Sequence, residues 1–277
     1  MFLARSLLVI ALVAGGTPDA LAQAAGARRY RAVFDGPFAD ASLAITGSPY
    51  SGRVQSGVYG RESQEWVYRD AQGRTRTERP MFETEDIRLI QIVDPVGGYQ
   101  YVVDPVNCVA HRIKNRPVSS RAAEGMDPRW REIVNLAARS FHHETLVVRL
   151  SEWRTTDVSL EDLGTRWIDG VLTRGMRMTR VFLPGPNGRQ RVVVTEAWVS
   201  DERKAIVASK RSDPIDGSWE TRTVEYRQGD PDAALFGPPP GFAVADHEGP
   251  FTLDVRLPGE LHCCSAQPAH SQVGCRF

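Results

Sequence analysis

The chain has 277 residues and carries 34 lysine and arginine side chains against 34 aspartate and glutamate side chains, so its formal net charge is zero. A balanced charge gives no general attraction to nucleic acids or anionic membranes, and we expect no nucleic acid partner. The length suffices for one large β domain or two smaller ones, and either can bury a core.

Residues 1–22 have the pattern of a signal peptide. Arg5 precedes an apolar run from Leu7 to Ala14, and Ala20 to Ala22 supply the small residues that a signal peptidase recognises. A buried N-terminal helix is the alternative, but it does not account for these features together. The apolar run is shorter than the ~20 residues of a membrane-spanning helix. We therefore predict cleavage near Ala22, export to the periplasm or the medium, and no membrane span.

After a lead-in over residues 23–46, turn signals alternate with segments rich in Val, Ile, Thr, Tyr and Trp through residues 47–245. The turn signals include Asp70 to Gly73, Pro95 to Gly98, Asp169-Gly170, Asn187-Gly188 and Asp216-Gly217. Asp-Gly and Asn-Gly pairs favour the positive φ angles of hairpin turns. The pattern predicts one mainly β domain of the α+β class, whose successive hairpins form a curved antiparallel sheet or a half-open barrel.

The segment from Trp66 to Pro80 contains a concentration of arginines after one of these turns. Side chains on a strand alternate between its two faces, which puts Arg76 and Glu78 on one face and Thr77 and Arg79 on the other. A strand that is polar on both faces is typical of an exposed or edge position. We therefore expect a structural hairpin rather than an anion site, and an effect of at most about 0.5 kcal/mol for Arg76→Ala.

One segment, residues 127–141, has helical rather than strand periodicity. Asp127 is a typical N-cap and Pro128 suits the first helical position. The apolar residues that follow at helical spacing are Trp130, Ile133, Val134, Ala137, Ala138 and Phe141. We predict an amphipathic helix whose apolar stripe packs on the sheet.

Large apolar side chains on the predicted strands are candidates for lining a ligand groove. They are Trp66, Tyr68, Trp167, Met176, Met178, Phe182 and Trp198. Such residues are usually core, but a curved sheet can leave one face partly unfilled, and methionines adapt to ligands of varied shape.

Motifs for catalysis or metal binding are not found in the sequence. It has no G-x-S-x-G, no Walker-type loop and no H-E-x-x-H. Adjacent His142 and His143 diverge on either a strand or a helix, and His262 and His270 do not have the usual zinc-ligand spacing to the nearby cysteines. We therefore expect no enzymatic activity, no metal and no cofactor.

Four cysteines, Cys108, Cys263, Cys264 and Cys275, belong to a chain that is predicted to enter an oxidising compartment, where disulfides are expected. Adjacent Cys263 and Cys264 rarely bond to each other because of backbone strain, so two complete pairings remain open. Residues 246–277, which carry three of the cysteines, show little periodicity. We predict that this tail is irregular.

A series of motifs between about Gly47 and Val244 resembles a group of uncharacterised secreted β-rich proteins of bacteria. The motifs are GSPYSG, VYRDAQGRTRTE, IVDPVGGYQYVVDP, LGTRWIDGVLTRGMRMT, EAWVSDERKAIVASKRSDPIDG and PDAALFGPPPGFAV. The resemblance implies a β-rich exported protein, and it assigns no catalytic residue.

A weaker similarity is to the periplasmic lipoprotein-carrier superfamily. It covers the turn around Ile168 to Gly175, the strand at Trp198 to Ser200 and the closing segment from Leu235. This similarity implies a half-open antiparallel barrel that holds acyl chains beneath helical lids, although the present chain shows one helix where carriers have several.

The sequence therefore favours an exported, non-enzymatic carrier or binding protein for an apolar or lipid-like ligand. The alternative is an envelope protein-interaction or sensor domain without a small-molecule ligand. In that case the polar strands would bind another envelope protein.

Overall fold

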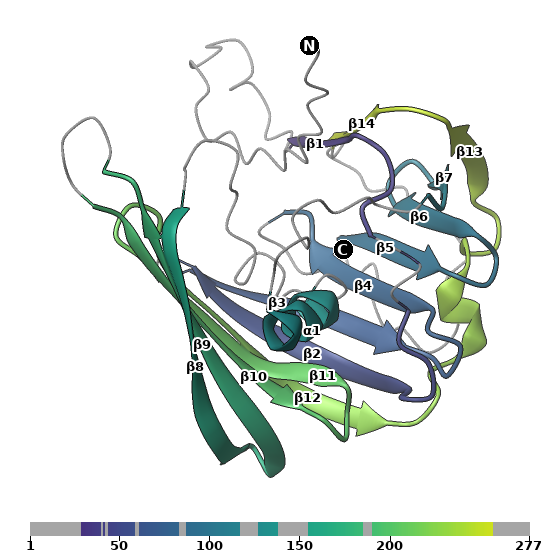
Figure 1. Cartoon of the computed structure of the whole chain (residues 1–277). Coiled ribbons are helices and arrows are strands. Elements are labelled where there is room, and N and C mark those ends of the chain that lie inside the picture. Colours follow the sequence, from purple (N-terminus) through teal and green to yellow (C-terminus); the bar gives the residue numbers. More distant parts are fainter. Residues whose placement is uncertain are drawn as a thin grey trace. The chain divides into compact units, whose positions relative to one another are not determined.

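The computed structural model of the chain describes residues 29–39, 41, 44–58, 61–82, 87–116, 127–137, 155–184 and 190–256 (Figure 1). Within these ranges it contains fourteen strands, one α-helix and one short 3₁₀ helix, which confirms the mainly β prediction. The predicted signal peptide, residues 138–141 of the predicted helix, His142, His143 and the three cysteines of the tail lie outside the described residues. The chain divides into two compact units, each of which is described by itself, and the single domain expected over residues 47–245 stays a prediction.

The first unit combines three separate stretches of the chain. It contains β1 (Arg29–Phe34), β4 (Thr75–Pro80), β5 (Arg88–Asp94), β6 (Tyr99–Asp104), β7 (Val109–Lys114), η3 (Ala233–Phe236), β13 (Ala243–His247) and β14 (Phe251–Arg256). Strands β4 to β7 form an antiparallel meander, β13 pairs with β7 in parallel, and β1 pairs with β14. One core of this unit joins Phe34, Leu89, Val102 and Leu253.

In its described residues, the second unit is an antiparallel sheet with one helix. It contains β2 (Tyr50–Val58), β3 (Arg61–Arg69), α1 (Pro128–Ala137), β8 (Thr155–Ile168), β9 (Val171–Phe182), β10 (Val192–Ser200), β11 (Ala205–Asp213) and β12 (Gly217–Gln228). The strands follow the order β3-β2-β12-β11-β10-β9-β8. Figure 1 shows α1 lying against this sheet, and the helix contacts β11.

Turn chemistry explains the hairpin between β8 and β9. Asp169 and Gly170 have φ angles of 50° and 74°. Positive φ at both central residues is the requirement of a type I′ turn, whose twist matches the flanking strands. The predicted turn at Asp169-Gly170 is therefore confirmed, while the one at Asn187-Gly188 lies outside the described residues.

The start of α1 also follows the prediction. The Asp127 side chain accepts a hydrogen bond from the Arg129 backbone N–H at 2.9 Å, as an N-cap does. Trp130 and Ile133 are 1% and 0% exposed, respectively. The helix therefore packs on the sheet through the predicted apolar stripe.

The prediction for β4 is wrong. Arg76 and Glu78 are both 8% exposed, whereas the polar alternation suggests an exposed or edge strand. The Arg76 guanidinium donates from Nε to Glu78 at 2.7 Å and from Nη1 to the Leu235 carbonyl of η3 at 3.0 Å. The polar side chains of β4 are therefore buried because they pair with each other and because η3, which is distant in the sequence, contacts them.

Regular structure also extends beyond the predicted β domain. Strand β1 lies within the expected lead-in over residues 23–46, and β14 lies within the expected irregular tail over residues 246–277. These two segments pair with each other through a ladder from Arg29 opposite Arg256 to Phe34 opposite Phe251. Each looked irregular alone because its partner is at the other end of the sequence.

Cys108 is the last residue of the turn before β7 and has a φ of 54°. It is disulfide-bonded. Its partner lies outside the described residues, so the choice between the two predicted pairings stays open.

Candidate functional site

The apolar residues beneath α1 form one continuous cluster in the second unit. We call this cluster the helix-covered face; its members are Trp130, Ile133, Met176, Met178, Ala197, Val199 and Ile206. Met176 lies opposite Ala197 in the ladder between β9 and β10, and Met178 lies opposite Thr195. Directly opposed residues have their side chains on the same face of a sheet, so Met176 and Ala197 share one face, and Met178, two positions further along β9, shares it too. Both methionines pack with Trp130 and Ile133 of the helix on this face.

The helix-covered face contains a polar group without a hydrogen-bond partner. The indole Nε1 of Trp130 is buried, and no acceptor for it is found among the described residues. A buried Trp N–H normally has an acceptor, because leaving it unpaired costs about 1–3 kcal/mol. The cluster is therefore not a fully satisfied core.

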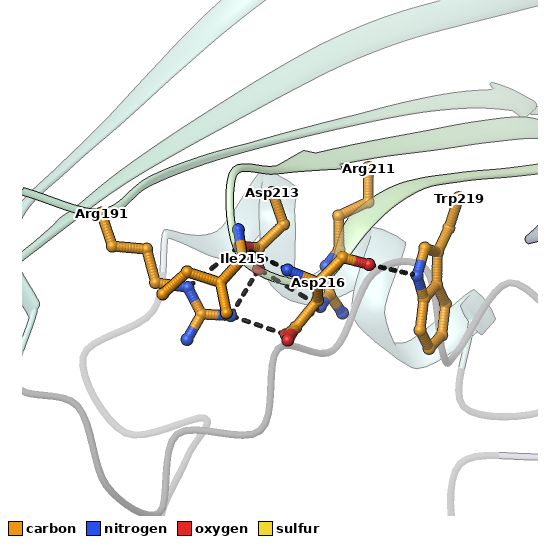
Figure 2. Close-up of polar contacts among 6 residues, drawn as sticks. All are labelled: Arg191, Arg211, Asp213, Ile215, Asp216 and Trp219. Atoms are coloured by element: carbon orange, nitrogen blue, oxygen red, sulfur yellow. Dashed lines mark hydrogen bonds and ion pairs between the residues drawn. The ribbon is translucent and has the colours of Figure 1, made fainter. Parts of the chain in front are cut away.

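A group of charged side chains, all buried except that of Asp216, continues the same face along the strands. Arg180 follows Met178 by two positions on β9, and Arg211 lies opposite Thr195 in the ladder between β10 and β11. Arg191 immediately precedes β10. We call Arg180, Arg191, Arg211, Asp213 and Asp216 the arginine cluster, and Figure 2 shows all of these except Arg180.

Asp213 organises one side of the arginine cluster. Its side chain accepts from Arg191 Nε at 3.1 Å and from the backbone N–H groups of Ile215 and Asp216 at 3.0 and 3.3 Å (Figure 2). Burial alone would raise the pKa of Asp213, but these hydrogen bonds, led by the one from Arg191, lower it below its usual value. The hydrogen bond to Asp213 in turn raises the pKa of Arg191.

Asp216 bridges two of the arginines. It accepts from Arg191 Nη2 at 2.7 Å and from Arg211 Nη2 at 3.1 Å, and its backbone carbonyl accepts from the Trp219 indole at 3.2 Å (Figure 2). Arg211 also lies 4.9 Å from the centre of the Trp219 ring. The turn after β11 thus holds Arg191 and Arg211 in fixed positions.

Arg180 differs from the other two arginines because neither carboxylate of the cluster contacts it. It is 8% exposed, and its Nε lies 2.9 Å from the Met178 sulfur, a weak acceptor. Its Nη1 is buried and has no hydrogen-bond partner in the described part of the chain. Burial lowers the pKa of Arg180, and the positive charge of Arg211 lowers it further.

The structure brings together only some of the seven predicted ligand-lining residues. Met176 and Met178 lie in the helix-covered face, and Phe182 is buried on the same strand beside Val193. Trp198 lies opposite Gly175 and belongs to a different cluster, with Ile168, Val171 and Val207.

The remaining three candidates lie elsewhere in the second unit. Trp167 is near the end of β8 and 70% exposed. Trp66 and Tyr68 are half-buried on β3, which is separated from β9 by β2, β12, β11 and β10.

The arginine cluster is absent from the sequence-based candidates, although β9 carried a signal for it. Met176, Met178, Arg180 and Phe182 alternate along β9, and all four are buried. An arginine in step with buried apolar residues is unusual, because arginine is almost never buried unless it is paired. This phase relation distinguishes Arg180 from Arg177 of the same strand, which lies on the other face.

The described residues show neither a metal site nor a membrane-spanning helix. No three His, Cys, Asp or Glu side chains come together as a metal site requires. No helix in these ranges is long and apolar enough to cross a membrane.

No known protein-family model matches the chain. No curated protein sequence matches it either. Among solved structures, the chain is similar to the MucA/MucB complex of Pseudomonas aeruginosa, with 10% identity over 68% of this chain and 55% of that one, at a TM-score of 0.38. It thus spans less than two thirds of that structure's chain.

Two other solved structures are distantly similar. The lipoprotein LppX of Mycobacterium tuberculosis is 13% identical over 68% of this chain and 89% of its own, at a TM-score of 0.28. A LolA superfamily protein of Nitrosomonas europaea is 7% identical over 72% of this chain and 94% of its own, at a TM-score of 0.30. The similarity to all three is structural and distant.

Proposed function

We propose that the protein is an exported, non-enzymatic carrier or binding protein that holds an apolar or lipid-like ligand between α1 and the sheet of the second unit. The observation that carries this proposal is the helix-covered face. It combines two adaptable methionines with a buried Trp130 N–H that lacks an acceptor among the described residues. A ligand with an apolar body and one acceptor atom would fill such a site.

The helix α1 is suited to act as a lid. Its described part has ten residues, and a helical segment of that length is marginal in water without tertiary packing. On its exposed side, Glu132 pairs with Arg174 of β9 at 3.3 Å. Exposed ion pairs of this kind contribute only about 0–1 kcal/mol. Among the described residues of α1, Trp130 and Ile133 are the ones buried against the sheet, so a small outward movement of the helix would admit a ligand that contacts both side chains.

A displacement assay with a neutral fluorescent probe tests the proposal. N-phenyl-1-naphthylamine should gain fluorescence on binding, and dodecanol should displace it. Met178→Asn, which puts an amide in the helix-covered face, should weaken both ligands by tenfold or more. Thr179→Asn is the matched control, because it places the same side chain on the opposite face of the same strand, and it should change neither affinity.

The proposal can also be tested if Met178→Asn fails to fold. Circular dichroism checks folding of the variant, and native mass spectrometry of the wild-type protein checks for co-purified lipid. Wild-type protein that is empty, binds no probe and shows no displacement by dodecanol would overturn the proposal.

The alternative, an envelope protein-interaction domain, is favoured by a different feature. Strand β8 has fourteen residues and stands at the end of the strand order among the described strands. Val158 and Trp167 are more than half exposed along it. A long exposed edge can accept a strand from another protein. A photo-crosslinking residue at position 167, compared with one at position 158, would identify such a partner in cells. If a proline at position 160 abolishes the crosslink, the partner binds by strand addition.

A further inference from the structure

We infer that Arg180 binds the anionic head group, a carboxylate or a phosphate monoester, of an amphiphile whose apolar chain lies along Met178 and Met176 beneath α1. The inference rests on the proposed function and names its ligand class. The ligand would then be an ionised amphiphile rather than a neutral lipid.

The position of Arg180 next to the apolar site is fixed by the strand. Residues two apart on a strand point to the same face and lie less than about 7 Å apart along it. Arg180, Met178 and Met176 therefore form one row, with the guanidinium at one end and the helix-covered face at the other. The 2.9 Å contact between Arg180 Nε and the Met178 sulfur joins the polar part of this row to the apolar part.

The guanidinium of Arg180 lacks the partner that a buried charge needs. Buried charges in proteins are normally paired and hydrogen-bonded, because removing them from water is costly. Arg180 is nine-tenths buried, and its Nη1 has no partner in the described ranges. A carboxylate or phosphate is the group that guanidinium binds best, through two parallel N–H···O bonds.

The neighbouring charges favour an anion from outside over an internal carboxylate. Asp213 and Asp216 are engaged by Arg191 and Arg211 and by backbone N–H groups, and neither contacts Arg180. Burial lowers the pKa of Arg180, and the positive charge of Arg211 nearby lowers it further. A bound anion would offset the repulsion between the two guanidinium groups, and its attraction to Arg180 would be stronger than in water because the site is buried.

A structural role for Arg180 is the competing interpretation. Its apolar stem would then fill space beside Met178, as arginine stems often do, and its head would reach water. The burial of Nη1 argues against this, because an arginine that fills space keeps its charged end solvated.

The test measures head-group preference at constant chain length. Dodecanol, dodecanoate and dodecyl phosphate compete with N-phenyl-1-naphthylamine at pH 8, where both anions are ionised. Acetate and inorganic phosphate are tested alongside them as head groups without a chain. We expect at least one of the two long-chain anions to bind tenfold or more tightly than dodecanol, and the short anions to compete only weakly.

Variants of two arginines on β9 attribute the preference to one side chain. Arg180→Gln should bring the ratio of anion to dodecanol affinity close to one. Arg180→Lys keeps the positive charge but loses the planar guanidinium that binds an anion through two parallel hydrogen bonds, so it should give an intermediate ratio. It also tests the inference if Arg180→Gln fails to fold. Arg177→Gln, the same change on the opposite face, should keep the wild-type ratio.

The outcomes separate this inference from the proposed function. If dodecanol and both long-chain anions bind equally well to the wild-type protein, or if Arg180→Gln retains the preference, the head-group inference is wrong and the carrier proposal stands. If inorganic phosphate binds as tightly as dodecyl phosphate, the site takes a free anion and the inference is also wrong. If no twelve-carbon ligand binds, the proposed function itself fails.

Discussion

Gly175 of β9 lies opposite Trp198 of β10, and the contact between them leads to a strong prediction for Gly175→Ala. An added Cβ would lie 2.4 Å from Cζ3 and 2.5 Å from Cη2 of the indole ring, closer than any real carbon contact. The φ of Gly175 is not in the left-handed region, so the backbone itself tolerates alanine. The whole effect of the substitution therefore comes from the ring.

The size of the effect follows from how tightly the indole is held. Trp198 is 7% exposed, and the guanidinium of Arg166 lies 3.5 Å from the centre of its ring. The ring cannot move away from Gly175 without displacing Arg166 or leaving its cluster. Overpacking costs about 1–3 kcal/mol and complete loss of a buried Trp about 3–5 kcal/mol. We expect Gly175→Ala to cost about 3 kcal/mol, or roughly 6–12 °C in melting temperature.

Urea unfolding followed by circular dichroism measures this cost. Gly57→Ala is the matched control, because Gly57 also lies on a strand, β2, and an added Cβ there meets nothing within 4 Å. It should be neutral or slightly stabilising, since alanine restricts the unfolded chain. In a Trp198→Leu background, Gly175→Ala should cost less than about 1 kcal/mol. An unchanged cost in that background, or no cost in the wild-type background, would refute the reasoning.

The remaining predictions concern buried charges and pH. Asp213→Asn removes a carboxylate that compensates the buried Arg191, and it should lower the free energy of unfolding by about 3 kcal/mol in urea. Arg76→Ala leaves Glu78 buried and should cost about 2–3 kcal/mol rather than nothing; equal stability of the variant and the wild type would show that the buried pair is unimportant. Burial lowers the pKa of His111, so its contribution to stability is complete above the unfolded value of about 6.5 and decreases as the pH falls below it; replacing His111 with Asn should flatten the melting temperature between pH 7 and 5.

Local signals in the sequence predicted the elements of the fold well. Asp169-Gly170 specified a hairpin, and Asp127 with Pro128 marked the start of the helix, because turns and caps depend on a few neighbouring residues. The burial of β4 could not be predicted in this way. Arg76 is covered by η3, whose Leu235 is 159 positions away, and nothing near β4 announces that contact.

The candidate site was partly predictable for the same reason. Met176 and Met178 were singled out as large apolar side chains on a strand, and the structure puts them in one cluster, while their role in lining a ligand stays a prediction. Trp198 and Trp167 met the same criterion but lie in another cluster and in solvent, respectively, because residue type does not determine the sheet face or the position along the hairpin. Arg180 was missed because arginine on a strand is normally assumed to face water.

The pairing of β1 with β14 has a consequence for how the protein is made. Arg29 and Asp254, an ion pair in this ladder, are separated by 225 positions, and the second unit occupies most of the chain between them. Because the chain appears from its N-terminus onward, the second unit can fold as soon as residue 230 has emerged into the compartment where folding takes place, whereas β1 waits for the last described strand. Closure of so long a loop is slow, and an unpaired edge exposed in the meantime invites aggregation. The first unit is thus the one for which a chaperone, or rapid completion of the chain, matters most.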